Sequence, residues 1–182
     1  MARDTLSRSL HDVGLAAWFG GTLANAVALN PASAEADSST GTGAVANVGW
    51  DRWTPVNGAA IGAHLVGSVG QIVGNKGRLG AQEGVASMAL AKTALTAAAL
   101  GVTAYSRVLG KTVSSQTRMP AHSATEPDAS TPPKVAAAQR QLRQLQWVVP
   151  ALTGALVVVS SFAGEQQRAS EERRGVRQRL VG

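Results

Sequence analysis

The sequence predicts an all-α protein, a four-transmembrane-helix bundle whose last helix extends beyond the membrane. The first observation is that residues 147–164, WVVPALTGALVVVSSFAG, contain no charged residue. At 1.5 Å per residue, a helix of this length nearly crosses a hydrocarbon core of about 30 Å. The second is that three further long apolar runs precede it. The third is that only 4% of the residues are aromatic, and alanine, glycine, valine and leucine dominate the runs. Such small side chains suit helices that pack closely in lipid.

The composition narrows the class of function. The chain has 182 residues, no cysteine and a net charge of +6. The absence of cysteine excludes disulfides and thiolate metal sites. The three histidines have no ligand spacing, so we expect no metal site and no cofactor. The basic residues flank the apolar runs and do not form one patch interleaved with aromatic residues, so the expected partner is a lipid bilayer and not nucleic acid.

A single integral membrane domain is predicted over residues 1–182. From Lys134 the helical pattern is amphipathic and continues into the last apolar run, so the last helix should protrude from the bilayer. Pro55 suits the first turn of the second span, where its missing N–H costs nothing. The expected spans are 13–30, 55–75, 84–109 and 145–164, with polar loops at 31–54 and 110–133 and a basic C-terminal tail at 165–182.

Small residues repeat every four positions on the first three spans. Ridges of this kind allow the backbones of neighbouring helices to approach closely. We therefore expect these three spans to pack through their ridges. The residues expected at the contacts are Gly20, Ala24, Ala63, Gly67, Ala97 and Gly101.

Three tryptophans lie beside the spans. Trp50 and Trp53 flank an Asp-Arg pair before the second span, and Trp147 begins the last one. Tryptophan is enriched at membrane–water interfaces, so all three are expected to be interfacial anchors. The alternative for Trp50 and Trp53 is the aromatic rim of a ligand site.

The charges around the first span predict an orientation. Arg3 and Arg8 precede this span, whereas the following loop is acidic apart from Arg52. Since basic residues accumulate on the cytoplasmic side, we expect a multi-pass protein of the cell membrane with both termini in the cytoplasm. The basic outer end of the last helix argues against this orientation.

Lys92 is the main candidate for an intramembrane polar site. A charge inside a span is costly and indicates a function by default. Its long side chain could also reach the membrane surface or form a structural ion pair, with Asp12 or Glu83 as partner. His64 lies in the middle of the second span, where a hydrogen bond between helices is the simplest role, and Asn25 is expected to make a similar contact.

Seven motifs that together cover most of the chain carry a resemblance to a known family. They are WFGG (18–21), GWDRWTPVN (49–57), AIGAHLVG (60–67), AKTALTAAALG (91–101), ATEP (124–127), AQRQL (138–142) and LQWVVPALTGALVV (145–158). In these motifs the chain resembles a family of small actinobacterial four-helix integral membrane proteins. The resemblance implies a location and a topology, and no chemistry. The opening stretch, with His11 before WFGG, is also similar to other four-helix membrane families, including copper-resistance-type proteins.

The sequence contains no recognisable catalytic motif. Contexts typical of a Ser-His-Asp triad, of HExxH and of phosphate-binding glycine loops are absent. We therefore expect a non-enzymatic helix-packing or complex-associated subunit, present as a homo-oligomer or within a membrane complex. One alternative is a small transporter or proton-coupled carrier that uses Lys92 and His64. Another is a membrane redox or haem protein.

Overall fold

The computed structural model describes residues 4–74, 85–115 and 118–181; of residues 85–86 and 165–181 it describes only the backbone. Within this part of the chain, four helices are long and apolar enough to cross a membrane. The predicted all-α class and the four-helix bundle are confirmed. The last helix is the longest, so it extends well beyond the length that a bilayer requires.

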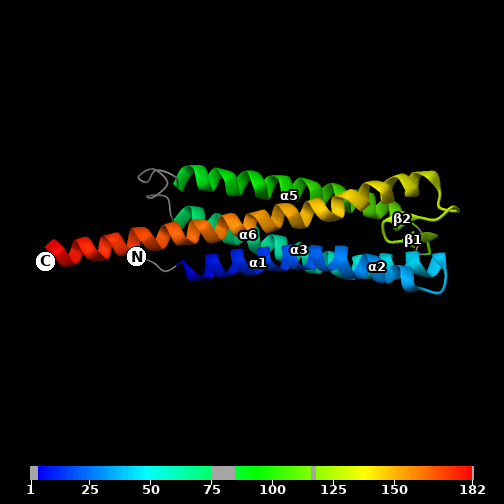
Figure 1. Ribbon diagram of the computed structural model, residues 1–182, viewed down its shortest axis with the longest axis horizontal. Coiled ribbons are helices and arrows are strands. Elements are labelled where there is room, and N and C mark those ends of the chain that lie inside the picture. Colours follow the sequence, from blue (N-terminus) through cyan, green and yellow to red (C-terminus); the bar gives the residue numbers. More distant parts are fainter. Residues whose placement is uncertain (1–3, 75–84, 116–117, 182) are drawn as a thin grey trace.

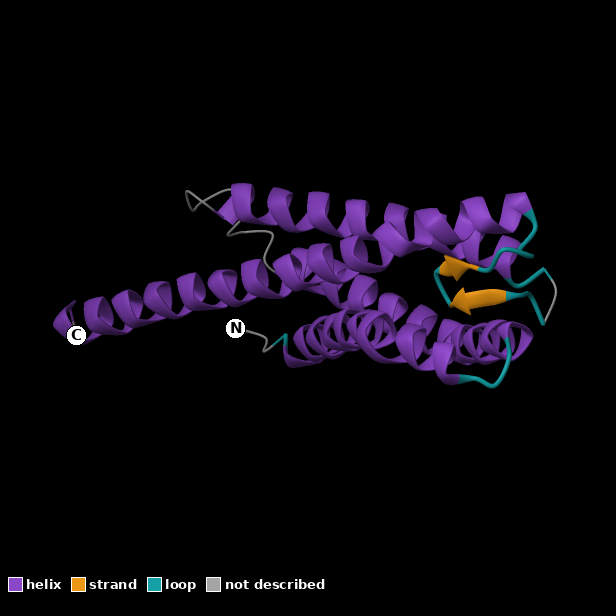
Figure 2. Cartoon of the chain, turned by 45° about the vertical axis from the view of Figure 1, so that its right-hand side comes forward, coloured by secondary structure: helices purple, strands orange, loops and turns teal. Residues whose placement is uncertain are grey.

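The helices run lengthwise beside one another and form two antiparallel pairs (Figures 1 and 2). Helix α1 packs along α3, α5 packs along α6, and α1 joins the two pairs by contacting α6, whereas α3 and α5 contact each other only weakly. The two described connections, from α1 to α3 and from α5 to α6, lie at the end of the bundle opposite the N-terminus (Figure 1). The two strands lie at the same end. The bounds are α1 Thr5–Ala24, α2 Asn30–Ala32, α3 Ser39–Gly74, α5 Val85–Val113 and α6 Pro133–Val181.

The first helix changes its geometry near its end. After α1, a π-helical turn (Asn25–Leu29) leads into α2, and a 3-10 turn (Ser33–Glu35) follows. Pro31 explains part of this change, because it has no N–H to donate to the carbonyl four residues earlier. The helical path therefore runs from Thr5 to Glu35, which is longer at both ends than the expected span of 13–30.

The expected polar loop at 31–54 is the largest error of the sequence analysis. Helix α3 already begins at Ser39, and Ser38 caps it by accepting a hydrogen bond from the Gly41 N–H at 3.1 Å. Pro55 therefore lies inside α3 and not at its start. The small residues of 39–54 are helical because they pack against the rest of the bundle: a Cβ on Gly43 would lie 1.8 Å from the Met119 carbonyl oxygen. Only residues 36–38 separate the two helical segments.

A small hairpin covers the loop-side end of the bundle. Strands β1 (Ala121–Ser123) and β2 (Glu126–Pro127) pair antiparallel within the expected polar loop of 110–133. A hydrophobic cluster of Val113, Met119, Val135 and Ala138 anchors this region to α5 and α6. The turn after β2 is held by Asp128, whose carboxylate accepts hydrogen bonds from the N–H and hydroxyl of Ser130, and these bonds lower the pKa of Asp128.

One core layer joins all four helices. It consists of Trp18 of α1, Ala60 of α3, Ala99 of α5 and Val149 of α6, each less than 9% exposed. We call this set the Trp18 layer. The indole of Trp18 is completely buried and fills the space between three small or β-branched side chains. Large-against-small packing of this kind fills a bundle core without voids.

The predicted small-residue ridges must be corrected. Gly67 does lie at a close helix contact, but a Cβ on Gly20 or Gly101 would meet no atom within 4 Å. Ala24 and Ala97, on the same ridges, are exposed, and Ala63 is half-buried. The four-residue repeat places these small residues on one face of each helix, but on α1 and α5 this face points outward. Inside the bundle, α1 instead presents larger side chains such as Leu15 and Trp18.

We predict that Gly67→Ala destabilises the bundle. Its Cβ would lie 2.3 Å from the His11 nitrogen and 2.5 Å from the Ser7 carbonyl oxygen, so the backbone of α1 would have to move. Overpacking of this kind lowers the free energy of unfolding by about 1–3 kcal/mol. Unfolding in mixed micelles titrated with SDS measures this loss. Gly62→Ala on the same helix meets nothing within 4 Å and is the control. Equal stability of the two variants would contradict the observed α1–α3 contact.

Candidate functional site

Two features of the bundle, one on each side of the Trp18 layer, are candidate functional sites. The first is a polar cluster on the side of the N-terminus, formed by His11, Asp12, His64, Lys92 and Thr96, which we call the histidine centre. The rings of His11 and His64 are in contact, with centroids 4.6 Å apart. Both residues are almost completely buried, at 1% and 0% exposure. The His64 ring also lies 6.1 Å from that of Trp18.

Glycines bring the two histidines together. A Cβ on Gly14 would lie 2.5 Å from the Ala60 carbonyl oxygen and from the His64 nitrogen. Gly67 makes the equivalent close approach to His11 on the other helix. Only hydrogen in place of Cβ permits backbones this near each other. The histidine contact is therefore built by the α1–α3 interface.

Hydrogen bonds fix the roles of the ring nitrogens. His11 Nδ1 donates to the Asp12 carboxylate at 2.7 Å. His64 Nδ1 lies 3.4 Å from the His11 carbonyl oxygen, which can only accept, so this nitrogen carries the proton. His64 Nε2 then accepts from the Thr96 hydroxyl, also at 3.4 Å. His11 Nε2 is buried and has no hydrogen-bond partner among the described residues.

Lys92 completes the histidine centre from α5. Its side chain is half-buried, and its charge interacts with those of Asp12 and Arg8. Of the two predicted partners of Lys92, Asp12 binds His11 instead, and Glu83 lies outside the described residues. The structure thus brings together three of the predicted residues, Asp12, His64 and Lys92, around His11, which the sequence analysis did not select.

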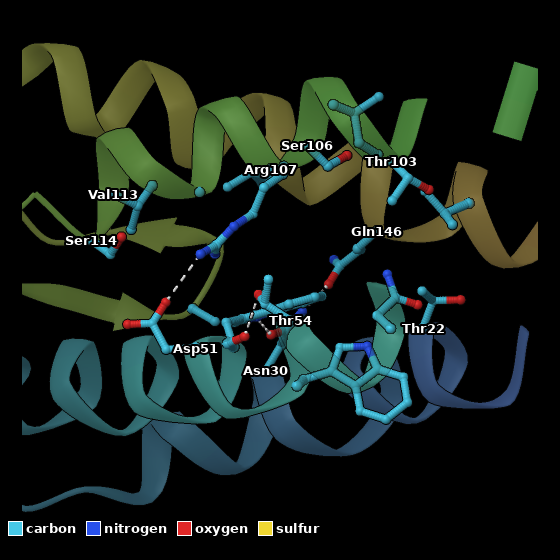
Figure 3. Close-up of a pocket in the computed structure, with 18 of the residues that line it drawn as sticks. Thr22, Asn30, Asp51, Thr54, Thr103, Ser106, Arg107, Val113, Ser114 and Gln146 are labelled. Atoms are coloured by element: carbon cyan, nitrogen blue, oxygen red, sulfur yellow. Dashed lines mark hydrogen bonds and ion pairs between the residues drawn. The ribbon is translucent and has the colours of Figure 1, made fainter. Parts of the chain in front are cut away.

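The second feature is a pocket of about 330 Å³ between the α1–α3 pair and the α5–α6 pair (Figure 3). We call it the loop-side pocket, since it lies between the Trp18 layer and the hairpin. Ile61 and Leu100, which pack against the Trp18 layer, and Val149 of the layer itself line its inner end. It is partly open to the surroundings, and most of its lining is apolar. Its volume falls within the range of about 300–1,000 Å³ that is usual for ligand sites.

A buried asparagine joins three helices beside this pocket. Asn30 donates to Gln146 of α6 at 2.7 Å and accepts from the Trp50 indole of α3 at 3.0 Å. Asn30 therefore makes the interhelical contacts that we expected of Asn25, which is buried one turn earlier in the π-helical turn. The Asn-Pro dipeptide at the end of an apolar run suggested a helix end, so the sequence gave no sign of this role.

One ion pair crosses the pocket. Figure 3 shows Arg107 of α5 extending towards Asp51 of α3, and their nearest nitrogen and oxygen lie 3.4 Å apart. Both side chains are exposed to more than a third of their surface, so the pair is worth little stability by itself. Its consequence is electrostatic, because these two residues are the charged members of the described lining and they neutralise each other.

Four lining residues carry buried polar atoms without a partner. On α3 these are the indole nitrogen of Trp53 and the carbonyl oxygen of Asn57, and on α5 the hydroxyls of Thr103 and Ser106. Their spacings of four and three residues place each pair on one face of its helix. These four atoms have almost no accessible surface, so they lie within the walls of the pocket and do not face its void. The surface that the pocket offers to a ligand is therefore mainly apolar.

The predicted tryptophan anchors have different surroundings. Trp50 and Trp53 are half-buried and line the pocket, and the Trp53 ring lies directly over Gly21. This placement corresponds to the alternative of an aromatic rim. Trp147 is 50% exposed on α6, as an anchor would be.

The chain was compared with models of protein families, with curated proteins and with solved structures, and none of them matches it. The resemblance to small actinobacterial membrane proteins therefore stays a prediction. Within the described residues, no group of three His, Asp or Glu side chains is placed to hold a metal ion.

We predict that Asn30 and Trp50 are energetically coupled. Asn30→Ala leaves the Trp50 indole N–H and the Gln146 side-chain carbonyl oxygen without partners in a part-buried place, which costs about 1–3 kcal/mol. Trp50→Phe removes the other end of one bond, so the double variant should cost less than the two single variants together. The free energy of unfolding of all three variants tests this, and strict additivity would show that the bond contributes nothing.

Proposed function

We propose that this integral membrane protein is a non-enzymatic carrier that holds an amphiphilic small molecule in the loop-side pocket. The observation that carries the proposal is the partly open pocket of about 330 Å³ between two helix pairs, whose lining is largely apolar with some neutral polar residues. Apolar walls with a few placed polar groups are the usual construction of small-molecule sites. The weak contact between α3 and α5 supports entry of a ligand between the pairs.

The histidine centre supports proton coupling, which extends the proposal. Ionisable residues inside a membrane commonly form proton relays in transporters. Here His11, His64 and Lys92 lie in the bundle directly beyond the Trp18 layer, and Ile61 and Leu100 contact that layer from the pocket side. A shift of Trp18 would therefore affect both the pocket and the histidine centre.

The chemistry of the pocket supports a non-enzymatic role. Its described charged residues, Asp51 and Arg107, bind each other, and the other polar residues of its described lining are neutral. The structure gives less support to a haem protein with two axial histidines. The rings of His11 and His64 touch each other, so no porphyrin plane fits between them.

A role as a subunit of a complex is the second candidate. The ridges of α1 and α5 that contain Gly20 and Gly101 point outward, and a Cβ on either glycine would meet no atom within 4 Å in the described part of the chain. Outward small-residue ridges would allow a helix of another chain, or a second copy of this one, to approach closely.

For the location we propose the cell membrane, with both termini in the cytoplasm. The two arginines before the first span support this orientation. The loop-side pocket would then lie near the outer surface of the membrane.

We predict that Gly58→Leu blocks ligand binding. Gly58 lines the pocket, and a Cβ on it would meet nothing within 4 Å, so a leucine can enter the pocket without disturbing the fold. Gly62→Leu, one turn further along α3, also meets nothing within 4 Å but does not line the pocket. Binding of a fluorescent long-chain alcohol to protein in nanodiscs should weaken at least about tenfold for Gly58→Leu, equivalent to about 1.4 kcal/mol, and should stay unchanged for Gly62→Leu.

Equal binding by both variants would contradict the placement of the site. Failure of the parent protein to bind more probe than empty nanodiscs would contradict the proposed function itself.

Lys92→Met tests the proton coupling. If Lys92 serves a relay, the variant should fold and bind the probe normally but lose uptake driven by a pH gradient in proteoliposomes. If Lys92 is only a poorly partnered charge in an apolar segment, the variant should keep uptake and gain stability, because charges inside a span are costly. Thermal unfolding of both proteins separates these outcomes.

A further inference from the structure

The lengths of the helices and the positions of their charges locate the surface of the membrane on the bundle. Helix α3 has 36 residues. At 1.5 Å per residue it is about 54 Å long, whereas a hydrocarbon core is about 30 Å thick. We infer that the membrane surface on the loop side lies at the level of Arg52, and that arginines at this level bind lipid phosphates. Residues 39–50 of α3, the hairpin and residues 133–139 of α6 then form a cap outside the lipid, which we call the hairpin cap.

The composition of α3 and α6 changes at this level. Residues 53–74 of α3 contain no charged residue, and they span about 33 Å, enough to cross the hydrocarbon core. Asp51 and Arg52 directly precede them, and residues 39–50 are rich in Ser, Thr and Gly. On α6, residues 144–164 are also uncharged and span about 31 Å, and Arg143 precedes them. On both helices, the part suited to lipid therefore begins directly after an arginine.

Contacts between the helices place these arginines at one level. Arg107 of α5 lies 3.4 Å from Asp51, the residue before Arg52 on α3. Tyr105, on the same turn of α5, donates a hydrogen bond to Gln141 of α6, less than one turn from the arginine where the uncharged stretch begins. Basic and aromatic residues thus form a belt around three helices, as is typical of a membrane–water interface. A membrane surface further out would put these charges in hydrocarbon, which is costly.

Two arginines of this belt are free to bind lipid. Arg52 and Arg140 are exposed and have no hydrogen-bond or ion-pair partner among the described residues. Side chains of a helix lean towards its N-terminus, which for α3 and α6 is the loop side, so both guanidinium groups extend away from the hydrocarbon. Trp147, 50% exposed, lies two turns further in on the same face of α6 as Arg140. An arginine outside a tryptophan matches the order of phosphate and interface in a lipid leaflet, and guanidinium groups bind phosphate well.

The hairpin cap is built for water and not for lipid. Within the described chain its sheet has two strands, so each strand has an edge without a neighbouring strand. Such edges do not occur in hydrocarbon, where nothing satisfies their backbone groups. The cap also covers its own apolar residues, since α5 and α6 contribute to a buried cluster at its base. The cluster consists of Val113, Met119, Val135 and Ala138.

Four exposed valines of α3 test the level of the membrane surface, because the chain contains no cysteine. Val45, Val48, Val56 and Val66 are 45%, 44%, 50% and 62% exposed, so cysteines there would react similarly in water. Each is replaced by cysteine in turn, and the reaction with a charged maleimide is followed in nanodiscs, which leave both faces of the bilayer accessible. We expect Val45→Cys and Val48→Cys to react at least about tenfold faster than Val56→Cys and Val66→Cys, since the reactive thiolate is disfavoured in apolar surroundings.

The same four variants unfolded in SDS are the control, and their rates should agree. Slow reaction of Val45→Cys and Val48→Cys in nanodiscs would place the cap in lipid and overturn the inference. Fast reaction of Val56→Cys would overturn it in the opposite direction, since the membrane surface would then lie further in. Neither result depends on whether the loop-side pocket binds a ligand, so the proposed function is tested separately.

The phosphate contacts are tested with spin-labelled lipids. In bilayers of phosphatidylcholine, we expect the protein to immobilise spin-labelled phosphatidylglycerol more strongly than spin-labelled phosphatidylcholine, because anionic lipids are attracted to basic residues at the surface. The double variant Arg52→Gln, Arg140→Gln should lose this preference. The double variant Arg118→Gln, Lys134→Gln removes the same charge from exposed positions of the cap region and should keep it. Equal preference in both double variants, or none in the parent protein, would overturn the assignment of phosphate binding to Arg52 and Arg140.

Discussion

The whole architecture depends on the packing of one tryptophan. Trp18 is the large side chain of a layer to which each of the four helices contributes one residue, and it is completely buried there. The two helix pairs meet mainly where α1 contacts α6, whereas α3 and α5 barely touch. The Trp18 layer adds a contact shared by all four helices and divides the interior into two parts. Towards the termini lies the histidine centre, and towards the hairpin lies the loop-side pocket.

The two sides of the Trp18 layer are held together by different means. Towards the termini, the backbones of α1 and α3 meet at Gly14 and Gly67, so there is no room between them for anything larger than hydrogen. Towards the hairpin, side chains keep the pairs apart, and Asn30 and the Arg107–Asp51 pair bridge the remaining space. Lipid offers no competing hydrogen bonds to polar groups, so these few bridges determine the geometry of the pocket.

The sequence was sufficient for the class of the fold and for the presence of four helices that are long and apolar enough to cross a membrane. Long uncharged runs around Trp147, His64 and Ala97 can be satisfied in lipid only as helices, because every backbone N–H and C=O must be bonded within the segment. The same runs also indicated Lys92 and His64 as unusual, since polar side chains in such segments are rare. The helix over residues 39–54 was missed because it is rich in Ser, Thr and Gly, which favour loops locally. Its helical state comes from packing against Met119 and the capping bond of Ser38.

By itself, the sequence determined which segments are helical rods and which of their residues are small, polar or aromatic. Only the tertiary structure decided how each rod is rotated about its own axis. This rotation places Trp18 inward and Gly20 outward, joins His11 to His64, and brings Arg107 to Asp51. The physical reason is that a repeat of small residues defines one face of a helix but does not specify which helix packs against that face. The packing partner of each helix is determined only when side chains from all four helices fill the core together. This packing depends on contacts between residues that are far apart in the sequence.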